Sequence, residues 1–424
     1  MLEYEDALAR LLAGAVVLAE TETVATQAAA GRVLADGLRS TLDVPPLDNT
    51  SMDGYALRCA EVPESGTKLV VAQRIPAGSV GHTLAPGTAA RIFTGAPLPA
   101  DADAVVMQEL CSVAGEAITV NHVPHPGEWI RRRGEDIAAG AEVLAAGTRL
   151  TAAHVGVAAS VGAAQLTVFR RLRVALFSTG DELAMPGEPL KPGGIYNSNR
   201  YTLRALLEGL GCEVADLGIV PDTREATRAA LREAAAGNDL ILTSGGVSVG
   251  EEDHVKPSVE AEGSLDLWKI AIKPGKPLAF GSVLRKVMPP AQPAAVSLAD
   301  GAGDTAPSVV AGPAAAFIGL PGNPVSSFVT FLMLVRPFIL KCQGATELRP
   351  RARGLQADFD CKGDPRREFL RARINDTGGL DLFPNQSSGV LTSCTWADGL
   401  IDNPPRRAIV SGDTVRFLPF SELI

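Results

Sequence analysis

The sequence has little of what marks several protein classes. Its six cysteines are far apart, with no C-x-x-C pair and no histidine at metal-ligand spacing. This excludes a disulfide framework and a structural zinc site, and we expect reduced thiols in a cytoplasmic protein. Lysine and arginine total 39 against 48 aspartate and glutamate, a net charge of −9. The chain therefore lacks the basic excess that a general nucleic-acid binder needs.

Long apolar runs are also missing. The N-terminus, Met1-Leu-Glu-Tyr-Glu-Asp, is acidic and does not resemble a secretory signal. The most apolar stretch, Phe328 to Val335, is followed by Arg336 and Pro337, which we expect to end it. Because a bilayer-spanning helix needs about twenty apolar residues, we expect no membrane segment.

The 424 residues, 46% of them hydrophobic, are enough for about three domains. Residues between about Thr41 and Glu135 form short β-rich runs punctuated by glycine and proline, which predicts an all-β insert. Helical texture precedes it and returns at Thr151–Val161, so we expect the flanking pieces to form one domain. The helical spacing before the insert is carried by Ala7, Leu8, Leu11, Leu12 and Val16.

From Arg173 the pattern alternates between strand and helix, which predicts a parallel, doubly wound α/β sheet. Asp222 with Glu225 is expected to form a capping box for the second helix. The expected strands are Val174–Ser178, Val214–Val220, Asp239–Thr243 and Ala316–Leu320, and the expected helices are Asn199–Leu210, Thr223–Ala236 and one that starts at Asn323-Pro324.

Residues 287–316 are rich in Pro, Ala, Gly and Ser, and we interpret them as a flexible surface insertion. The sequence becomes β-rich again after Gly344, which predicts a small C-terminal β domain.

Three strand ends carry the candidate chemistry, because ligands bind beyond the carboxyl ends of open α/β sheets. Ser178-Thr-Gly-Asp-Glu182 follows the first strand, Asp222 the second, and Ser244-Gly-Gly-Val-Ser248-Val-Gly-Glu-Glu-Asp253 the third. Gly245 and Gly246 allow a sharp bend that presents N–H groups to phosphate. A plain tight turn is the alternative, since the segment matches no nucleotide fingerprint.

The acids indicate a cation. If Glu182, Asp222 and Asp253 converge, two carboxylates about 5 Å apart repel by roughly 3 kcal/mol at an effective dielectric near 20. A hard ion such as Mg²⁺ would relieve this repulsion beside a phosphate ligand. Separate helix caps and solvated acids remain the alternative.

Lys273 and Lys276, in Lys273-Pro-Gly-Lys-Pro, are the candidate cationic groups for phosphate or an oxyanion such as molybdate, although lysines in such turns are usually surface charges.

Seven motifs together resemble, in order, those of the MoeA family of molybdenumtransferases, which includes the enzymatic C-terminal region of gephyrin. They are Asp48-Asn-Thr-Ser-Met-Asp53-Gly-Tyr-Ala, Thr94-Gly-Ala-Pro with Val105-Val-Met-Gln-Glu109, Arg133-Gly-Glu-Asp136, the segments after Ser178 and Ser244, Lys273-Pro-Gly-Lys-Pro and Leu320-Pro-Gly-Asn-Pro324. The resemblance implies an elongated homodimer with four parts in each chain: a helical connecting domain (1–42 and 137–172), a lasso-like β domain (43–136), an α/β domain (173–344) and a C-terminal β-barrel (345–424).

The resemblance also implies a reaction. Adenylyl-molybdopterin and molybdate are the substrates, Mg²⁺ is the cofactor, and AMP and Mo-molybdopterin are the products. It implies that Asp53, Thr94 and Asp136 face the α/β site across the dimer, and that Glu182, Asp222 and Asp253 hold the metal. Lys273, Lys276, Pro321, Pro324 and either Ser387 or Ser388 would line the adenylate or molybdate region, together with Ser178, Thr179, Gly180, Ser244, Gly245, Gly246 and Ser248.

Two other functions stay open at this stage. The α/β domain alone also resembles the adenylyltransferase that activates molybdopterin, which we expect as a transient partner; the motifs near Asp53 and Thr94 do not belong to it. The other is a scaffolding role, by analogy with gephyrin. We do not favour it, because nothing in this sequence corresponds to the extra N-terminal domain and long linker of such proteins. The sequence does not decide between molybdate and tungstate.

Overall fold

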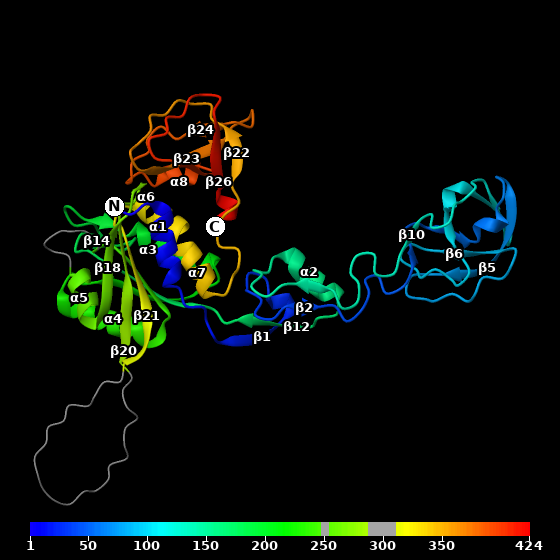
Figure 1. The fold of residues 1–424 in the computed structure, drawn as a ribbon, viewed down its shortest axis with the longest axis horizontal. Coiled ribbons are helices and arrows are strands. Elements are labelled where there is room, and N and C mark those ends of the chain that lie inside the picture. Colours follow the sequence, from blue (N-terminus) through cyan, green and yellow to red (C-terminus); the bar gives the residue numbers. More distant parts are fainter. Residues whose placement is uncertain (247–253, 287–310) are drawn as a thin grey trace, which may run out of the picture.

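The structure has a larger body, formed by the central sheet and the C-terminal strands, and a β domain at a distance from it; the chain passes from the larger body to this β domain and returns (Figure 1). The computed structural model describes residues 1–246, 254–286 and 311–424. A central sheet with its helices and the C-terminal strands lie at one end of the molecule, and a small connecting region separates them from the β domain at the other end. Both termini lie in the larger body, which contains the central sheet and the C-terminal strands (Figure 1).

The central sheet has six strands, in the order β16 (Glu213–Val220), β13 (Arg173–Thr179), β17 (Leu240–Ser244), β21 (Ala311–Leu320), β20 (Pro277–Lys286) and β18 (Gly263–Lys269). The first four are parallel, as the sequence predicts. β20 and β18 are antiparallel to their neighbours. The sheet is therefore mixed and not wholly parallel, because β20 pairs directly with the next strand in the chain.

Both faces of this sheet are buried, which explains why its strands have continuous apolar sequences. In β13, Val174 and Leu176 belong to one core, and Ala175 and Phe177 belong to another. The first core includes side chains of α1 (Tyr4–Ala13), α3 (Ser198–Gly209) and the helix from Pro324; the second includes those of α4 (Arg224–Gly237) and α5 (Val255–Glu262). The doubly wound α/β class is thus confirmed. Val16, expected with α1, is instead 78% exposed beyond its end.

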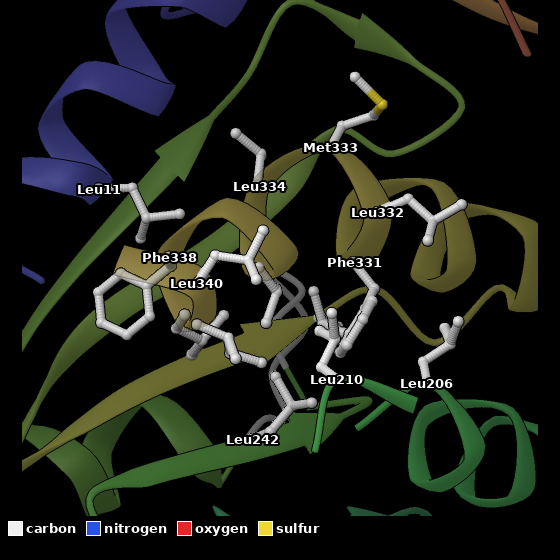
Figure 2. Packing of buried hydrophobic residues seen from close by; sticks show 14 of the residues in the cluster. Leu11, Leu206, Leu210, Leu242, Phe331, Leu332, Met333, Leu334, Phe338 and Leu340 are labelled. Carbon is white, nitrogen blue, oxygen red and sulfur yellow. The ribbon is translucent and has the colours of Figure 1, made fainter. Parts of the chain in front are cut away.

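A long helix lies in the larger core (Figure 2), formed by α6 (Pro324–Thr330), a π-helical turn (Phe331–Val335) and α7 (Arg336–Cys342). Arg336 and Pro337 interrupt the apolar run in the sequence, but the helix continues through both. Pro337 has no N–H to offer the carbonyl of Met333. The Tyr4 hydroxyl donates to that carbonyl at 3.2 Å. A side chain of α1 therefore supplies a hydrogen bond that the proline cannot make.

This helix of 19 residues, whose most apolar window has a mean hydropathy of 1.6, is the one candidate membrane span by length and composition in the described part of the chain. Inside the protein, 94% of its most apolar window is buried. Its apolar composition is accounted for by this position in the core.

Two helix starts at the carboxyl edge of the sheet are capped by side chains, whereas Asn323, the N-cap of α6, makes no such bond. Asn197 caps α3 by accepting from the N–H of Arg200, and Thr223 caps α4 by accepting from the N–H of Ala226. The prediction of a cap at Asp222 is therefore wrong by one residue. A threonine hydroxyl can also accept this bond at an N-cap, and this leaves Asp222 outside the helix.

The connecting region joins two distant parts of the sequence. β1 (Thr21–Ala25) pairs with β12 (Gln165–Phe169), β2 (Leu38–Arg39) pairs with β11 (Glu142–Leu144), and α2 (Ala152–Ser160) begins at its cap Thr151. A short helical turn, η1 (Thr26–Ala28), follows β1. The helix α1, which we expected in this region, packs instead in the core of the α/β domain.

The distant domain is all β, as predicted. Its sheet has the order β7 (Ala104–Met107), β4 (Gly54–Leu57), β6 (Thr88–Ile92), β5 (Thr67–Ile75), β9 (Ala117–Val120) and β8 (Cys111–Ala114). The turns η2 (Cys59–Glu61) and η3 (Gln108–Leu110) join its strands. The chain enters and leaves it through the pair β3 (Asn49–Thr50) and β10 (Ile130–Arg131).

The C-terminal strands curl into a barrel. The path runs through β24 (Leu380–Leu382), β23 (Arg367–Ile374), β25 (Gly399–Asn403), β26 (Thr414–Pro419) and β22 (Arg353–Gln356), and a bridge between Ala357 and Leu380 closes it. The short helices α8 (Thr392–Trp396) and η5 (Phe420–Glu422) complete it. β19 (Ile272–Lys273) of the preceding domain pairs with β23, which fixes the barrel beside the central sheet.

Most of the predicted insertion, residues 287–310, lies outside the described residues. Residues 311–316 are described, and they belong to β21, where Ala314 and Ala315 pair with Leu284 and Val283. The predicted end at 316 is wrong, because alanines paired within a sheet carry little strand signal in the sequence.

Candidate functional site

A pocket of about 920 Å³ lies at the carboxyl ends of β13, β17 and β21. Thr179, Ser244 and Pro321, at or directly beyond those ends, line it together with residues of the C-terminal domain. This is the position in which open α/β sheets bind ligands.

Most of the residues chosen from the α/β and C-terminal motifs meet in this pocket: Thr179, Gly180, Glu182, Asp222, Ser244, Gly245, Gly246, Lys273, Lys276, Pro321, Pro324, Ser387 and Ser388. Both alternatives, Ser387 and Ser388, line it. Ser178 is fully buried in β13 and is not part of the lining. Ser248 and Asp253 lie outside the described residues.

The glycine turn after β17 brings that strand close to β13. Gly245 has φ +92°, and a Cβ there would lie 2.8 Å from the carbonyl oxygen of Thr179, so a side chain would be both strained and blocked. The N–H of Gly245 donates to the carbonyl of Leu320. The expectation that this N–H faces phosphate is therefore wrong, because the neighbouring strand uses it.

Two of the three predicted acids line the pocket. Glu182 folds back over the preceding turn, since a Cβ at Gly180 would lie 2.5 Å from its Oε2. Asp222 lies between β16 and α4. Within the residues that the structure describes, no three His, Cys, Asp or Glu are grouped to hold a metal ion. The predicted trio includes Asp253, so this does not test it.

Lys273 is held between the two domains. Its Nζ lies 3.1 Å from Asp364 and 3.1 Å from Glu368 of the barrel domain. Burial lowers the pKa of Lys273, but the bonds from Glu368 and Asp364 outweigh it and raise the pKa overall. Lys273, predicted as a cationic group for phosphate or an oxyanion, thus lines the pocket with its charge balanced by Asp364 and Glu368. Lys276, in the same lining, is exposed.

Arg366 is the most informative residue that the sequence reasoning missed. It lines the pocket, and its guanidinium donates to Asp364 at 3.1 Å and to the carbonyl of Ile272 at 3.4 Å. Burial raises the pKa of Asp364, but bonds from Arg366 and Lys273 outweigh it and lower the pKa to about 2. The mixed charges of Asp364-Pro-Arg-Arg-Glu368 before an apolar strand were the available signal.

Asn199 was also missed as a pocket residue. Its side-chain amide donates to Ser244 Oγ at 2.9 Å and to the carbonyl of Gly322 at 2.7 Å. It therefore holds together the loops that follow β17 and β21. Pro274, Gly275, Pro277, Gly322 and Asn323, which also line the pocket, belong to the predicted motifs but were not chosen individually. The other lining residues are Leu183 of β14 (Leu183–Ala184), Ile195 of β15 (Ile195–Tyr196), Asn197, Ser326 and Gln386.

The remaining predicted residues lie in or near the distant β domain (Figure 1). Asp53 Oδ1 accepts from the N–H of Thr94 at 2.8 Å and from its hydroxyl at 2.7 Å, and these bonds lower the pKa of Asp53. Asp136 lies on the returning connection, where its N–H donates to Val44. Among the described residues that line the pocket, none comes from this domain.

Three family models match the chain in succession. They are the MoeA N-terminal region (domain I and II) at residues 2–162, a "Probable molybdopterin binding domain" at 175–341, and the MoeA C-terminal region (domain IV) at 355–420. A curated relative from Haemophilus influenzae is 37% identical, and the match covers 100% of both chains. The chain belongs to the MoeA family.

Other family members agree with this assignment. A relative from a Nostoc species is 39% identical over 92% of this chain and 87% of its own. Both curated relatives are called molybdopterin molybdenumtransferase. A solved MoeA structure from Pyrococcus horikoshii matches with a TM-score of 0.80 and 26% identity, over 99% of this chain and 100% of its own. This MoeA-family chain is therefore a transferase of molybdenum cofactor biosynthesis, and the predicted multidomain architecture is confirmed.

Proposed function

We propose that the chain inserts molybdenum into molybdopterin, by Mg²⁺-dependent hydrolysis of adenylyl-molybdopterin in the presence of molybdate, with release of AMP. The observation that carries this proposal is the pocket itself. It combines the cationic groups of Lys273, Lys276 and Arg366 with the carboxylates of Glu182 and Asp222. Both substrates are anions, so such a pocket has binding groups for them and also a place for a cation.

The residues present fit a magnesium ion. Glu182 and Asp222 supply the hard oxygen donors that Mg²⁺ prefers, and they line one pocket. They would hold the ion, with Asp253 as the proposed third ligand. When bound, Mg²⁺ would supply stabilisation of the negative charge that develops on the phosphate oxygens during cleavage.

Other side chains of the pocket bind the anionic substrates. Lys276 and Arg366 bind anionic oxygen atoms, and Lys273 does so with its own charge balanced by Asp364 and Glu368. Ser387 and Ser388 offer hydroxyl groups from the barrel side. Cleavage breaks the pyrophosphate P–O bond and AMP leaves. We propose that a molybdate oxygen is the nucleophile: it bonds to the phosphorus that molybdopterin retains while the P–O bond to AMP breaks, and AMP leaves with the bridging oxygen. Water then cleaves the new P–O–Mo linkage as the dithiolene sulfurs bind the metal, so the overall reaction is a hydrolysis and AMP release depends on the arrival of molybdate.

We also propose that a second copy of the chain completes the site. Asp53, Thr94 and Asp136 lie in or beside the distant β domain, which Figure 1 shows far from the central sheet, and none of the described residues of that domain lines the pocket. If they take part in the reaction, they have to reach it from the partner of a homodimer. Mixing an Asp53→Ala chain with an Asp222→Ala chain should then restore part of the activity, because one of the two pockets in the mixed dimer has both groups intact.

The decisive experiment is turnover with purified protein, adenylyl-molybdopterin, Mg²⁺ and molybdate. The expected result is AMP release that requires both Mg²⁺ and molybdate. AMP release at the same rate without molybdate would contradict the coupled mechanism. Consumption of ATP to adenylate free molybdopterin would instead favour the adenylyltransferase function, and no turnover at all would favour a scaffolding function.

A further inference from the structure

One arginine of the barrel lies behind the pocket wall. Arg371, in the middle of β23, is 1% exposed and is the largest fully buried side chain among the described residues. It does not line the pocket. A buried guanidinium is costly unless each of its donors finds an acceptor, so the partners of Arg371 indicate what it is for.

All three nitrogens of its guanidinium donate to neutral oxygens. Nε donates to Ser393 Oγ at 3.1 Å, one terminal nitrogen to the carbonyl of Phe369 at 3.2 Å, and the other to the carbonyl of Ser387 at 3.4 Å. Burial lowers the pKa of Arg371 to about 10, so the group is still charged at neutral pH. A charged donor strengthens each of these bonds.

The backbone of the same residue holds the neighbouring side chain. The N–H of Arg371 donates to Gln386 Oε1 at 3.0 Å, and Gln386 Nε2 donates back to the carbonyl of Arg371 at 3.0 Å. On its other side the segment is fixed by the N–H of Val325, which donates to the carbonyl of Ser388 at 3.0 Å. Residues 386–388 are thus held between β23 and the start of α6.

We propose that Arg371 is a positioning residue, which acts through the segment 386–388 to set the hydroxyl groups of Ser387 and Ser388 in the pocket for anion binding. This proposal rests on the proposed function of that pocket. Arg371 itself touches no ligand, because it is buried behind the lining. A Met of similar length would fill the space but has no donor, and a Lys has its three N–H donors on a single nitrogen, which cannot reach the three oxygens that Nε and the two terminal nitrogens of Arg371 reach.

The chain offers a matched control. Arg336 is also buried, at 8% exposed, and burial also lowers its pKa to about 10. It donates to the carbonyls of Leu348 and Glu422, which are not in the pocket lining. Arg336→Lys therefore tests what the loss of any buried guanidinium does to the protein.

The experiment compares Arg371→Lys with Arg336→Lys in the full chain, by amide hydrogen exchange and by steady-state AMP release. For Arg371→Lys we expect about tenfold faster exchange at residues 386–388 and about a tenfold higher KM, with kcat nearly unchanged, as expected for the loss of a bond to a charged group. We expect neither change in Arg336→Lys. The rise in KM caused by Arg371→Lys should be smaller in a Ser387→Ala/Ser388→Ala background, because that variant has no hydroxyl groups for Arg371 to position.

Ser393→Ala provides a milder variant if Arg371→Lys does not fold. It keeps the buried charge but removes one acceptor of Arg371 and the donor to the carbonyl of Val390, so both effects should appear in the same direction. Unchanged exchange at 386–388, or the same rise in KM for Arg336→Lys, would overturn the proposal. Failure of the wild-type protein to release AMP would refute the proposed function instead, and the exchange result would still decide whether Arg371 holds the segment.

Discussion

The two ends of the central sheet carry different cavities. At the carboxyl ends lies the polar pocket of about 920 Å³. Near the starts of β13 and β17 lies a second cavity of about 700 Å³, lined by Leu172 and Leu240 and by the rings of Phe280 and Phe338. One sheet therefore presents a charged cavity at one end and a largely apolar one at the other.

The charged groups at the two ends are also used differently. At the amino end Arg170 donates to both oxygens of Asp239 at 2.7 and 2.9 Å, and the N–H of Arg173 donates to it at 2.9 Å. Burial raises the pKa of Asp239, but these bonds outweigh it and lower the pKa. This carboxylate is satisfied within the protein and stabilises the fold. At the carboxyl end, charged groups from two domains line a space that a ligand can enter.

The sharpest test of this difference is Asp222→Asn. The amide keeps the shape of the side chain but loses the charge that would hold a cation, so we expect a loss of about a hundredfold or more in kcat. The melting temperature should change little. AMP release at saturating substrate, with increasing Mg²⁺, measures the effect. Unchanged turnover would remove Asp222 from the mechanism.

At the other end, Asp239→Ala should affect stability and not activity. Removing one partner of this largely buried pair leaves Arg170 without its main acceptor, and we expect the free energy of unfolding to fall by about 3 kcal/mol. Denaturant unfolding measures the loss, and kcat/KM of the folded protein should stay within about twofold of wild type. A large fall in kcat/KM would mean that the two ends are coupled.

The smallest expected effect concerns the link between the two pocket-forming domains. The folded-state pKa of Asp364, about 2, is below its ordinary value of 3.8. A lowered pKa contributes stability above the ordinary value, and that contribution is lost as the pH falls from 3.8 toward 2. Unfolding free energies at acidic pH should therefore converge between wild type and Asp364→Asn. A constant difference between them across this range would contradict the assigned link.

The sequence predicts much of this fold for identifiable physical reasons. The strand around Val174 is recognisable because both sheet faces are buried, so its apolar residues are continuous. The helix α1 is recognisable from the apolar spacing of Ala7, Leu8 and Leu11, which are all buried. The prediction was wrong where local signals compete: Thr223 caps α4 in place of Asp222, and β21 begins among alanines that resemble a linker.

The candidate site was predictable only in part. Motifs with several polar residues in sequence, such as those after Ser178 and Ser244, indicated most of the lining. Arg366 comes from the barrel, and only the docking of that domain, distant in sequence, brings it to the pocket. Asn199 is a single polar residue of α3 in the α/β domain, and the packing of that helix decides that it faces the pocket. The direction in which Ser178 points, into the core, also depends on strand register, which the motif does not specify.

The pairing of β19 with β23 has a consequence for synthesis of the protein. Lys273 meets Glu368 only when the barrel has docked, and Arg366, Gln386, Ser387 and Ser388 all come from that late part of the chain. A nascent chain that has exposed only the α/β domain at the ribosome has the sheet but not the finished pocket. The pocket is therefore completed only when translation is nearly finished.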